Sequence, residues 1–567
     1  MTGTDEATIG PKLKIALIVD SNITSKYVYE LAQWGQQQGN LEISHLIIQN
    51  NVASSKKKGF FDGLSQTPKK WVIRDLARSA LRDLIWRIES KQIMRDRVHK
   101  DHLTQHNLFD LVKGSISLEP SISESGSAYR YGDGDIQEIR RLDFDILISC
   151  GSGTLHGEIL KSARFGVIAL HHTDNRINRG GPPAFWEVYR RQDSTGFTIQ
   201  QLTEDPGGGN VLFRGRLPTK GYWLVNQAAV CAKSNFYLKK VLSDIAETGQ
   251  LSVRRDSYPY FNPLYRSPGS RVLFSHLLTL ILQSINERAN NRYWKKYERW
   301  GVAFSHCDWR DLVMWRGIKI RNPPNHFLAD PFVVRHENGD YCFVEDLDYS
   351  IGRGYISVYK LLENDSERIG EVIVEPFHMS YPYIFEYQSK YYMCPEISES
   401  GQIRLYECVE FPLKWKLIKI LMDNVSAVDT TIFERDGTWW LFTNIDSINV
   451  GDHCSELSIF YADDPLTDRW TPHPNNPIFV DSLKARNGGI LIDGDLIFRV
   501  SQRQGFDQYG AGSGINRITH LSKTDYQEEA VFAVERNFFK NLIGTHHIHS
   551  NGRITVFDYL ERVRVDT

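Results

Sequence analysis

The densest group of chemically active side chains follows an apolar run at residues 167–170. Two histidines, His171 and His172, come directly after this run, and a polar turn follows them. An imidazole in such a loop can act as a general acid or base, or can stabilise an oxyanion. The candidate catalytic residues of this stretch are His171, His172, Asp174, Asn175 and Asp205.

An arginine and two glycines close the same turn. Arg179, Gly180 and Gly181 stand just before a helix-like run at residues 184–191. Backbone N–H groups at the start of a helix attract anions. We therefore expect these three residues to hold a phosphate or carboxylate of the substrate. A second apolar run, at residues 197–202, then leads into a loop with three consecutive glycines.

Nearly continuous apolar runs must position these side chains. Residues 13–19 (LKIALIV) and 144–150 (FDILISC) are typical of parallel strands that are buried on both faces. In an open α/β sheet, ligands bind at the carboxyl ends of the strands. We therefore expect the loop of Gly151, Ser152 and Gly153 to share one crevice with the histidines. No G-x-G-x-x-G follows the first run, so a nicotinamide cofactor is not expected.

The order of these motifs resembles the folate-dependent formyltransferases, such as methionyl-tRNA formyltransferase and the sugar N-formyltransferases. The matching motifs are GVI-x-x-H, RGG-P-x-x-W, TG-x-T-I and GG-x-V-L. The resemblance implies an open, mostly parallel sheet over residues 1–242. It also implies 10-formyltetrahydrofolate as the formyl donor, beside the first glycine loop. The family's catalytic His falls on His171, but its Asn and Asp fall on Ala169 and Gly207. Whether this fold transfers a formyl group or only binds a ligand therefore stays open.

Length and composition restrict the function classes. The 567 residues exceed what one hydrophobic core can hold, so two or three domains are expected. A formal charge of −2 gives no case for nucleic-acid binding. The 7 cysteines form no C-x-x-C pair, and we expect neither a disulfide framework nor a bound metal. The polar N-terminus lacks a signal-peptide pattern, so we expect a cytoplasmic protein.

A basic amphipathic stretch runs from Lys69 to Lys100. Its apolar residues recur at helical spacing, with arginines and lysines between them. One interpretation is a solvated helix packed on its domain, and the other is peripheral contact with an anionic membrane. Farther on, a Pro- and Tyr-rich stretch and a long helix at residues 271–299 predict a helical linker over residues 243–320. A homodimer is an assembly that we keep open.

From about residue 320 the pattern changes to short strands and tight turns. A turn followed by an aromatic strand recurs five times, at Gly339, Ser389, Gly437, Gly494 and Gly552. Asp-Gly and Asn-Gly between strand runs are hairpin signals. Regular recurrence of such units is typical of propeller blades. The sequence therefore predicts a five-bladed β-propeller over residues 321–567, and the whole chain is a multidomain α/β plus all-β protein.

Polar residues at the starts of the repeats would meet in the central channel, because the innermost strands line it. Asp330 in ADPF, Asp429 in VDTTIF and Arg486 in ARNGG lie at such starts, and Arg499 and Gln502 follow. Together these residues predict a site for a sugar or a phosphate. We expect Arg486 to pair with Asp330 or Asp429.

This half resembles the five-bladed arabinanase- and xylosidase-like glycoside hydrolases. In their pattern Asp330 matches the general base and Asp429 the pKa-modulating acid, but Arg486 stands where the proton donor belongs. A guanidinium cannot deliver a proton at neutral pH. The run ARNGG…FRVSQ is more similar to the propeller of plant glucosamine inositolphosphorylceramide transferases. The resemblance therefore implies binding of a glycan rather than its cleavage.

Both halves together predict a formyltransferase-like enzyme that acts on an amine of a sugar nucleotide or glycan precursor. The propeller would recognise the glycan. Two alternatives stay open. One is a non-catalytic glycan-binding or scaffold protein with two altered enzyme folds. The other is a carbohydrate enzyme, a hydrolase or a glycosyltransferase, that uses the propeller site.

Overall fold

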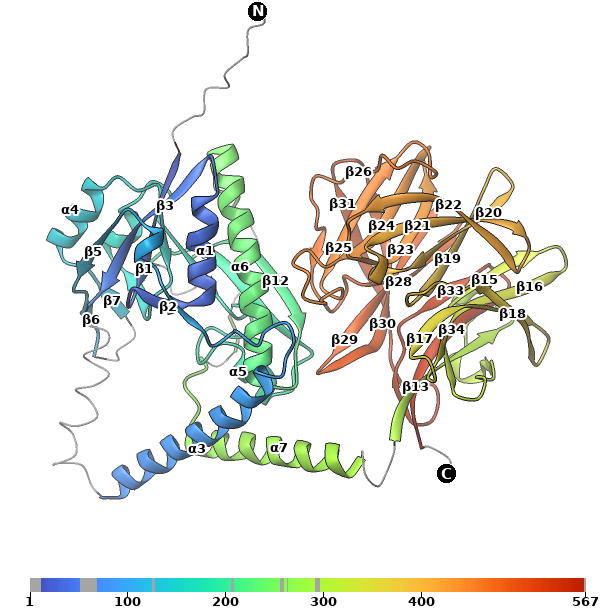
Figure 1. Ribbon diagram of the computed structural model, residues 1–567, viewed down its shortest axis with the longest axis horizontal. Coiled ribbons are helices and arrows are strands. Elements are labelled where there is room, and N and C mark those ends of the chain that lie inside the picture. The colour runs from blue at the N-terminus through green and yellow to red at the C-terminus, as the bar shows by residue number, and fades with distance from the viewer. Residues whose placement is uncertain are drawn as a thin grey trace, which may run out of the picture. The chain divides into compact units, whose positions relative to one another are not determined.

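The computed structural model describes residues 12–50, 69–124, 128–204, 209–254, 260–262, 264–290 and 296–564. Contacts divide the chain into two compact units (Figure 1). The N-terminal unit comprises residues Met1–Arg191, Thr195–Gly215 and Lys220–Ile281, and the C-terminal unit comprises residues Gln192–Ser194, Arg216–Thr219 and Leu282–Thr567. The domain borders that the sequence suggests at residues 242 and 320 stay predictions.

A mixed sheet is the framework of the N-terminal unit. Its seven described strands follow the order β12-β11-β10-β8-β1-β3-β5. The pairings from β10 to β5 are parallel, and β10 pairs antiparallel with β11. The mostly parallel sheet expected from the apolar runs is therefore confirmed. The strands are β1 Leu13–Val19, β3 Leu41–Gln49, β5 Gly114–Leu118, β8 Ile146–Ser149, β10 Val167–His171, β11 Ser194–Gln201 and β12 Asn210–Pro218.

The strand order reverses between β1 and β8. From β1 the chain runs outward to β3 and β5, and then crosses back to β8 and β10. Such a reversal is where open α/β sheets bind ligands. Two small sheets accompany the large one, formed by β2 Ile23–Ser25 with β4 Gln105–Asn107, and by β6 Ser121–Ile122, β7 Ala128–Arg130 and β9 Thr154–His156.

Helices cover both faces of this sheet. On one face, α4 packs Ile136 and Ile139 against Ala16 of β1. On the other face, Gly35 of α1 lies so close to Ile43 that an added Cβ would come within 2.7 Å of its side chain. None of the described helices is long and apolar enough to cross a membrane. The helices are α1 Lys26–Gln36, α3 Lys69–Ile93, α4 Asp133–Arg141, α5 Phe185–Tyr189, α6 Trp223–Thr248 and α7 Ser270–Ala289.

The sequence predicts one helix over residues 271–299, and the C-terminal part of this prediction is wrong. The helix α7 stops at Ala289, and β13 begins at Lys296. The strand β13 pairs antiparallel with β34, the last strand of the chain, and Arg299 contacts Glu561 across this ladder at 2.9 Å. Pairing with a partner more than 250 residues away overrides the local preference, and a sequence window cannot detect it.

Five antiparallel sheets make up the described part of the C-terminal unit (Figure 1). Four follow the chain in order, as β15-β16-β17-β18, β19-β20-β21-β22, β23-β24-β25-β26 and β28-β29-β30-β31, with β27 beside β25. The fifth combines β13 and β14 from the start of the unit with β32, β33 and β34 from its end.

The bounds of these strands follow from the hairpin pattern. They are β13 Lys296–Ser305, β14 Ile318–Lys319, β15 His326–His336, β16 Gly339–Asp348, β17 Arg353–Leu361, β18 Ser366–Ile373, β19 Ser380–Tyr387, β20 Lys390–Glu396, β21 Gln402–Glu410, β22 Lys414–Asp423, β23 Ala427–Arg435, β24 Thr438–Ile445, β25 Glu456–Ala462, β26 Thr471–Pro472, β27 Phe479–Val480, β28 Asn487–Asp493, β29 Leu496–Gly505, β30 Gln508–Leu521, β31 Tyr526–Val534, β32 Leu542–Gly544, β33 Ile548–Ser550 and β34 Thr555–Arg564.

All five predicted turns are hairpins and are therefore confirmed. In the third sheet, Arg435 pairs with Thr438 across Asp436-Gly437, whose φ angles are +51° and +75°. Two consecutive left-handed residues make the turn whose twist suits a hairpin, and Asp-Gly adopts it readily.

Candidate functional site

His171 lies at the carboxyl end of β10, and its side chain is exposed. The amide nitrogen of Gln200, on the neighbouring strand β11, donates a hydrogen bond to His171 Nε2 over 3.0 Å. Because Nε2 accepts, the proton of the neutral ring is on Nδ1. In this state His171 can donate to an oxyanion but cannot take a proton at Nε2. Burial lowers the pKa of the adjacent His172 to about 4, so that ring is neutral.

Asp174 is paired with two arginines. Its buried carboxylate contacts Arg176 at 2.7 Å and Arg214 at 3.5 Å. Such pairing fixes the polar turn, whereas the hydrogen bond of the His171 ring is with Gln200. Asp205, the other carboxylate that we expected here, lies outside the described residues.

Asn175 reaches the histidine through a relay. Its Nδ2 donates to Gln200 Oε1 at 3.2 Å, and its Oδ1 accepts from Arg214 at 2.9 Å. This fixes the orientation of the Gln200 amide, whose nitrogen then faces His171. Sequence reasoning missed Gln200, although it follows the TG-x-T-I motif directly.

The turn of Arg179, Gly180 and Gly181 packs against its own unit. The Arg179 guanidinium stacks over the Tyr260 ring at 4.3 Å. An added Cβ on Gly180 would come within 2.5 Å of the Tyr265 carbonyl oxygen, and Gly181 has a φ of +84°. The helix that follows, α5, has only 5 residues. This packing competes with the predicted binding of a phosphate, which stays a prediction.

The loop of Gly151, Ser152 and Gly153 also forms internal contacts. The backbone N–H and the hydroxyl of Ser152 both donate to the Asp20 carboxylate, at 2.8 and 2.5 Å, and Gln49 donates to it at 3.1 Å. An added Cβ on either glycine would collide with neighbouring side chains. These contacts fix the loop, and the binding of a folate beside it stays a prediction.

In the C-terminal unit, a β-bulge interrupts the first strand of four sheets. Asp330 and Asp429 lie in two of these bulges, with φ angles of +48° and +50°. Aspartate tolerates this left-handed conformation better than most residues. A bulge redirects a side chain and is frequent beside active sites. The register shifts follow Ala329, Ser380, Val428 and Asn487.

Arg486 joins two acidic side chains from other sheets. Its Nε donates to Asp429 at 2.6 Å and its Nη2 to Glu396 at 3.5 Å. The expected pairing of Arg486 with Asp429 is therefore confirmed. Gln502 donates to the same Asp429 oxygen at 2.9 Å. The guanidinium lies 4.8 Å from the centre of the Tyr509 ring. The residue Tyr509 is 38% exposed, so solvent reaches the cluster on this side.

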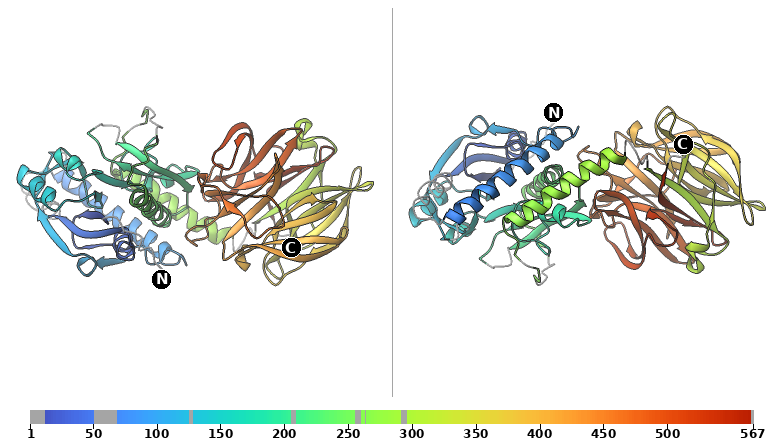
Figure 2. Two further views of the ribbon diagram at one scale, coloured as in Figure 1. Left: turned by 90° about the horizontal axis from the view of Figure 1, so that it is seen from above. Right: turned by 90° about the horizontal axis from the view of Figure 1, so that it is seen from below.

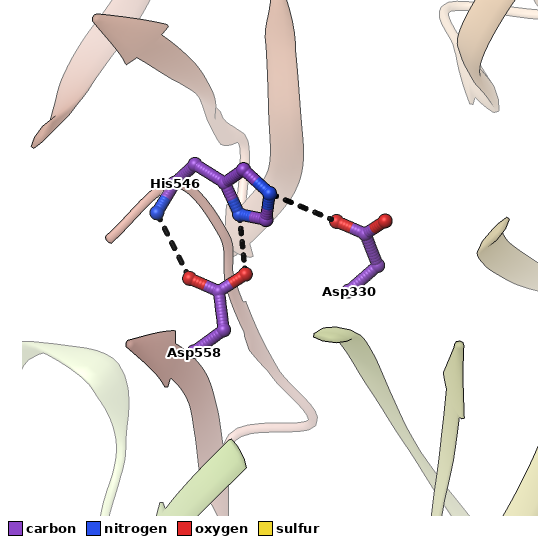
Figure 3. Close-up of side chains that lie close together, drawn as sticks. All are labelled: Asp330, His546 and Asp558. Carbon is purple, nitrogen blue, oxygen red and sulfur yellow. Dashed lines mark hydrogen bonds and ion pairs between the residues drawn. The ribbon is translucent and has the colours of Figure 1, made fainter. Parts of the chain in front are cut away.

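His546 lies between two carboxylates (Figure 3). Its Nδ1 forms a close ion pair with Asp558, and its Nε2 lies 3.9 Å from Asp330. The Trp300 ring stacks on the imidazole at 4.0 Å. Burial alone lowers the pKa of His546, but Asp558 and Asp330 outweigh it and hold the pKa above its usual value. His546 therefore favours its cationic form more strongly than a free imidazole does.

Three acids of this group hold their protons unusually strongly. Burial raises the pKa of Asp330 to about 7, with His546 opposing and Asp429 adding to the shift. Burial and neighbouring carboxylates also hold the pKa values of Glu345 and Glu396 well above their usual range. Perturbed acids mark candidate functional sites. We call the whole group the central cluster, and its members are Asp330, Glu345, Glu396, Asp429, Arg486, His546 and Asp558.

A cation is a further ligand that part of the cluster could hold. One ligand atom from each of Asp330, His546 and Asp558 lies within 4.8 Å of the others, in the described residues. However, His546 already binds Asp558 through Nδ1 and favours its protonated form, which competes with a metal. Our expectation of no metal stays a prediction.

Arg499 does not join the central cluster, contrary to our expectation. Its guanidinium makes two 2.8 Å contacts with Glu528 on β31 and donates to the Lys484 carbonyl at 2.7 Å. The residues of a strand alternate between two faces. Arg499 and Gln502, three residues apart on β29, therefore face opposite sides.

Sequence reasoning missed Glu345, His546 and Asp558, and it left Glu396 without a role. A signal for most of them was present in the sequence. The second strand of every hairpin carries a polar residue after its apolar run, opposite the start of the first strand. These residues are Glu345, Glu396, Asn444, Gln502 and Asp558.

Comparison with known proteins adds family information for this half. Residues 312–549 match the family model described as "Glucosamine inositolphosphorylceramide transferase 1, N-terminal". The chain is 37% identical over 219 residues to glucosamine inositolphosphorylceramide transferase 1 of Arabidopsis thaliana. It is 35% identical over 217 residues to the Oryza sativa subsp. japonica protein of that name. Each match covers 37% of this chain and 28% of the length of the relative.

A weaker similarity concerns the formyltransferases. The chain is 31% identical over 87 residues to methionyl-tRNA formyltransferase of Deinococcus radiodurans, covering 15% of this chain and 27% of that protein. Among solved structures, a thermostable family-43 glycoside hydrolase is 18% identical with a TM-score of 0.33, over 43% of this chain and 92% of that chain. A Bacillus subtilis arabinanase is 12% identical with a TM-score of 0.31, over 41% and 93%.

Proposed function

We propose that the five sheets of the C-terminal unit close into a five-bladed propeller with the central cluster on its axis. The sheet that joins β13 to β34 supports this, because it ties the first strand of the unit to its last. The innermost strands also contact one another in turn, from β15 through β19, β23, β28 and β33 back to β15. Closure of this kind leaves only short, protected sheet edges and gathers the starts of the repeats at one place.

The protein is, in this proposal, a sugar-modifying transferase whose central cluster holds the carbohydrate. The observation that carries it is the pairing of Arg486 with both Asp429 and Glu396. The arginine already pairs closely with Asp429 and contacts Glu396, so it suits a phosphate poorly. Carboxylates and a paired guanidinium instead accept from and donate to sugar hydroxyls, and Tyr509 offers an exposed ring for a sugar face.

An amino sugar fits the charge of the cluster best. Five acids face only two cations there, Arg486 and His546. Three of the acids have raised pKa values, and a nearby ammonium group favours their ionised form, so its binding would be coupled to the release of a proton. The family model that matches residues 312–549 is described as glucosamine inositolphosphorylceramide transferase 1, which is consistent with an amino sugar.

Binding of glucosamine, compared with glucose, tests this proposal. We expect calorimetry at neutral pH to show tighter binding of glucosamine, and Glu396→Gln to weaken it about tenfold or more, since Gln cannot ionise and form a charged hydrogen bond with the ammonium group. The matched control is Glu407→Gln, which removes a carboxylate of β21 that pairs with Lys390 outside the cluster. Equal binding by the protein and by Glu396→Gln would refute the assignment.

The finer proposal is transfer of a formyl group to the sugar amine by the N-terminal unit. The weak similarity to a formyltransferase and the exposed His171 support it. The Nδ1 proton of His171 would stabilise the oxyanion that forms when the amine attacks the formyl carbon. The amine must lose its proton to another group, because Gln200 occupies Nε2. Gln200 is thus a positioning residue.

Mass spectrometry can test this step directly. The protein is incubated with 10-formyltetrahydrofolate and a panel of amino sugars, and formylated sugar is measured. We expect His171→Ala to abolish the product and His172→Ala to reduce it much less, because the His172 ring is more buried. Formylation that persists in His171→Ala would remove this residue from the mechanism.

Glycoside hydrolysis is the second candidate, and one observation favours it. Burial and Asp429 hold the pKa of Glu396 well above its usual range, as a general acid requires, and Asp330 stands in the same cluster. Release of free sugar from aryl glycosides, abolished by Asp330→Asn, would establish hydrolysis and overturn the transferase proposal for this unit.

A further inference from the structure

The helix α7 carries an exposed apolar row. Phe274, Leu278 and Ile281 are 61%, 46% and 43% exposed, and they recur at intervals of four and three residues. Such spacing places them on one side of the helix. The row continues along the same helix with Leu282 and Ile285, which are also exposed.

Other apolar residues of α7 are buried against the N-terminal unit. Leu273, Leu277 and Leu280 pack with Ile85 of α3. His276 lies 5.2 Å, between ring centres, from Phe185, which is fully buried. The helix is therefore already anchored, and its exposed row is additional to the side chains that hold it in place.

The neighbouring helix α3 likewise has one side that faces the N-terminal unit and one side that is exposed. Glu89 accepts from the backbone N–H of Leu224 in α6, and Ile93 packs in the same cluster as Leu224. These residues face the body of the unit. Leu84, Arg87 and Lys91 are exposed and recur at intervals of three and four residues on the side away from the body.

The two exposed rows face the same direction. The helices α3 and α7 lie side by side, as the view from below shows (Figure 2), and Ile85 packs against α7. His276 on α7 and Glu89 on α3 mark the sides that face the unit, and they contact each other at 3.3 Å. At 3.6 residues per turn, the row on each helix lies opposite those inward residues. An apolar row thus runs beside a basic one.

We propose that this α3–α7 face docks on the surface of an anionic lipid bilayer. Phe, Leu and Ile side chains would enter the boundary between headgroups and acyl chains, and Arg87 and Lys91 would contact lipid phosphates. Between residues 78 and 100 there are seven arginines and lysines against three acids, one of which, Glu89, is buried against His276. This charge complements an anionic surface. A second copy of the same basic face would be repelled.

Sedimentation of the full chain with vesicles tests the proposal. The probes are phosphatidylcholine vesicles and vesicles in which about one third of the lipid is phosphatidylglycerol. We expect binding to the anionic vesicles, weakened by salt. Replacing Arg87 and Lys91 by Gln should lower the partition coefficient about fivefold per charge. Leu278→Glu with Ile281→Glu should abolish binding, because charges then replace the inserting side chains.

Matched controls separate docking from general surface effects. Val409→Glu with Ile492→Glu changes two exposed apolar residues of the C-terminal unit, and Arg517→Gln with Lys523→Gln removes two exposed cations there. Both should bind vesicles like the unaltered chain. Equal partition to neutral and anionic vesicles, or no sedimentation at all, would overturn the proposal. So would a dimer in light scattering that Leu278→Glu with Ile281→Glu converts to monomer without any vesicle binding.

Discussion

Replacing Asp330 by Asn should make the C-terminal unit more stable, and the gain should grow with pH. Asp330 is 6% exposed, and its Oδ1 has no hydrogen-bond partner among the described residues. Its backbone is left-handed, with a φ of +48°, which Asn adopts at least as readily. The substitution therefore removes a buried ionisable group while keeping its shape and its backbone conformation.

The size of the gain follows from the pKa. Burial moves the pKa of Asp330 from 3.8 to about 7. The folded protein thus keeps a proton that the unfolded chain loses, and stability falls as the pH rises through this window. Each pKa unit corresponds to about 1.4 kcal/mol. The shifted pKa of Asp330 therefore lowers the free energy of unfolding by about 4 kcal/mol above pH ~7, but by only about 1 kcal/mol at pH ~4.5. Asn has no such cost at either pH.

Urea unfolding at the two pH values measures this difference. Trp300, which stacks on His546 at 4.0 Å, is one of the 13 tryptophans whose total fluorescence follows unfolding. We expect Asp330→Asn to raise the free energy of unfolding by about 3 kcal/mol more at pH ~8 than at pH ~4.5. The matched control is Asp436→Asn, an 84% exposed aspartate with a φ of +51°, which should show no pH-dependent gain. A gain that is equal at both pH values, or a loss at pH ~8, would refute the reasoning.

Two further predictions concern buried arginines. Arg486→Gln leaves the buried carboxylate of Asp429 without its 2.6 Å partner, so the free energy of unfolding should fall by about 3–5 kcal/mol in urea titrations, and an unchanged value would contradict the pairing. Arg499→Gln breaks the pair with Glu528 and should destabilise the fold by a similar amount. It should nevertheless leave glucosamine binding intact under conditions where the variant is folded. Loss of glucosamine binding by folded Arg499→Gln would show that this arginine contributes to the binding site.

The elements with a strong local pattern could be predicted from the sequence alone. The run at residues 13–19 forms β1 with unchanged bounds, because apolar side chains on both faces suit only a central strand. The turn at Asp436-Gly437 was likewise predictable, since the two residues by themselves favour the left-handed conformation of a hairpin. In both cases the signal lies within a few residues.

The tertiary structure alone decided which polar residues meet. The pairing of β13 with β34 joins segments that no local pattern connects, and it replaced the expected helix. The bulge at Asp330 changes the side on which later residues of β15 point, and the segment before β33 places His546 between the carboxylates of Asp330 and Asp558. Successive side chains of a strand point to opposite faces of the sheet, so a shift of one position moves each following side chain to the other face. Sequence therefore determined the strands and turns, whereas bulges and long-range register selected the site.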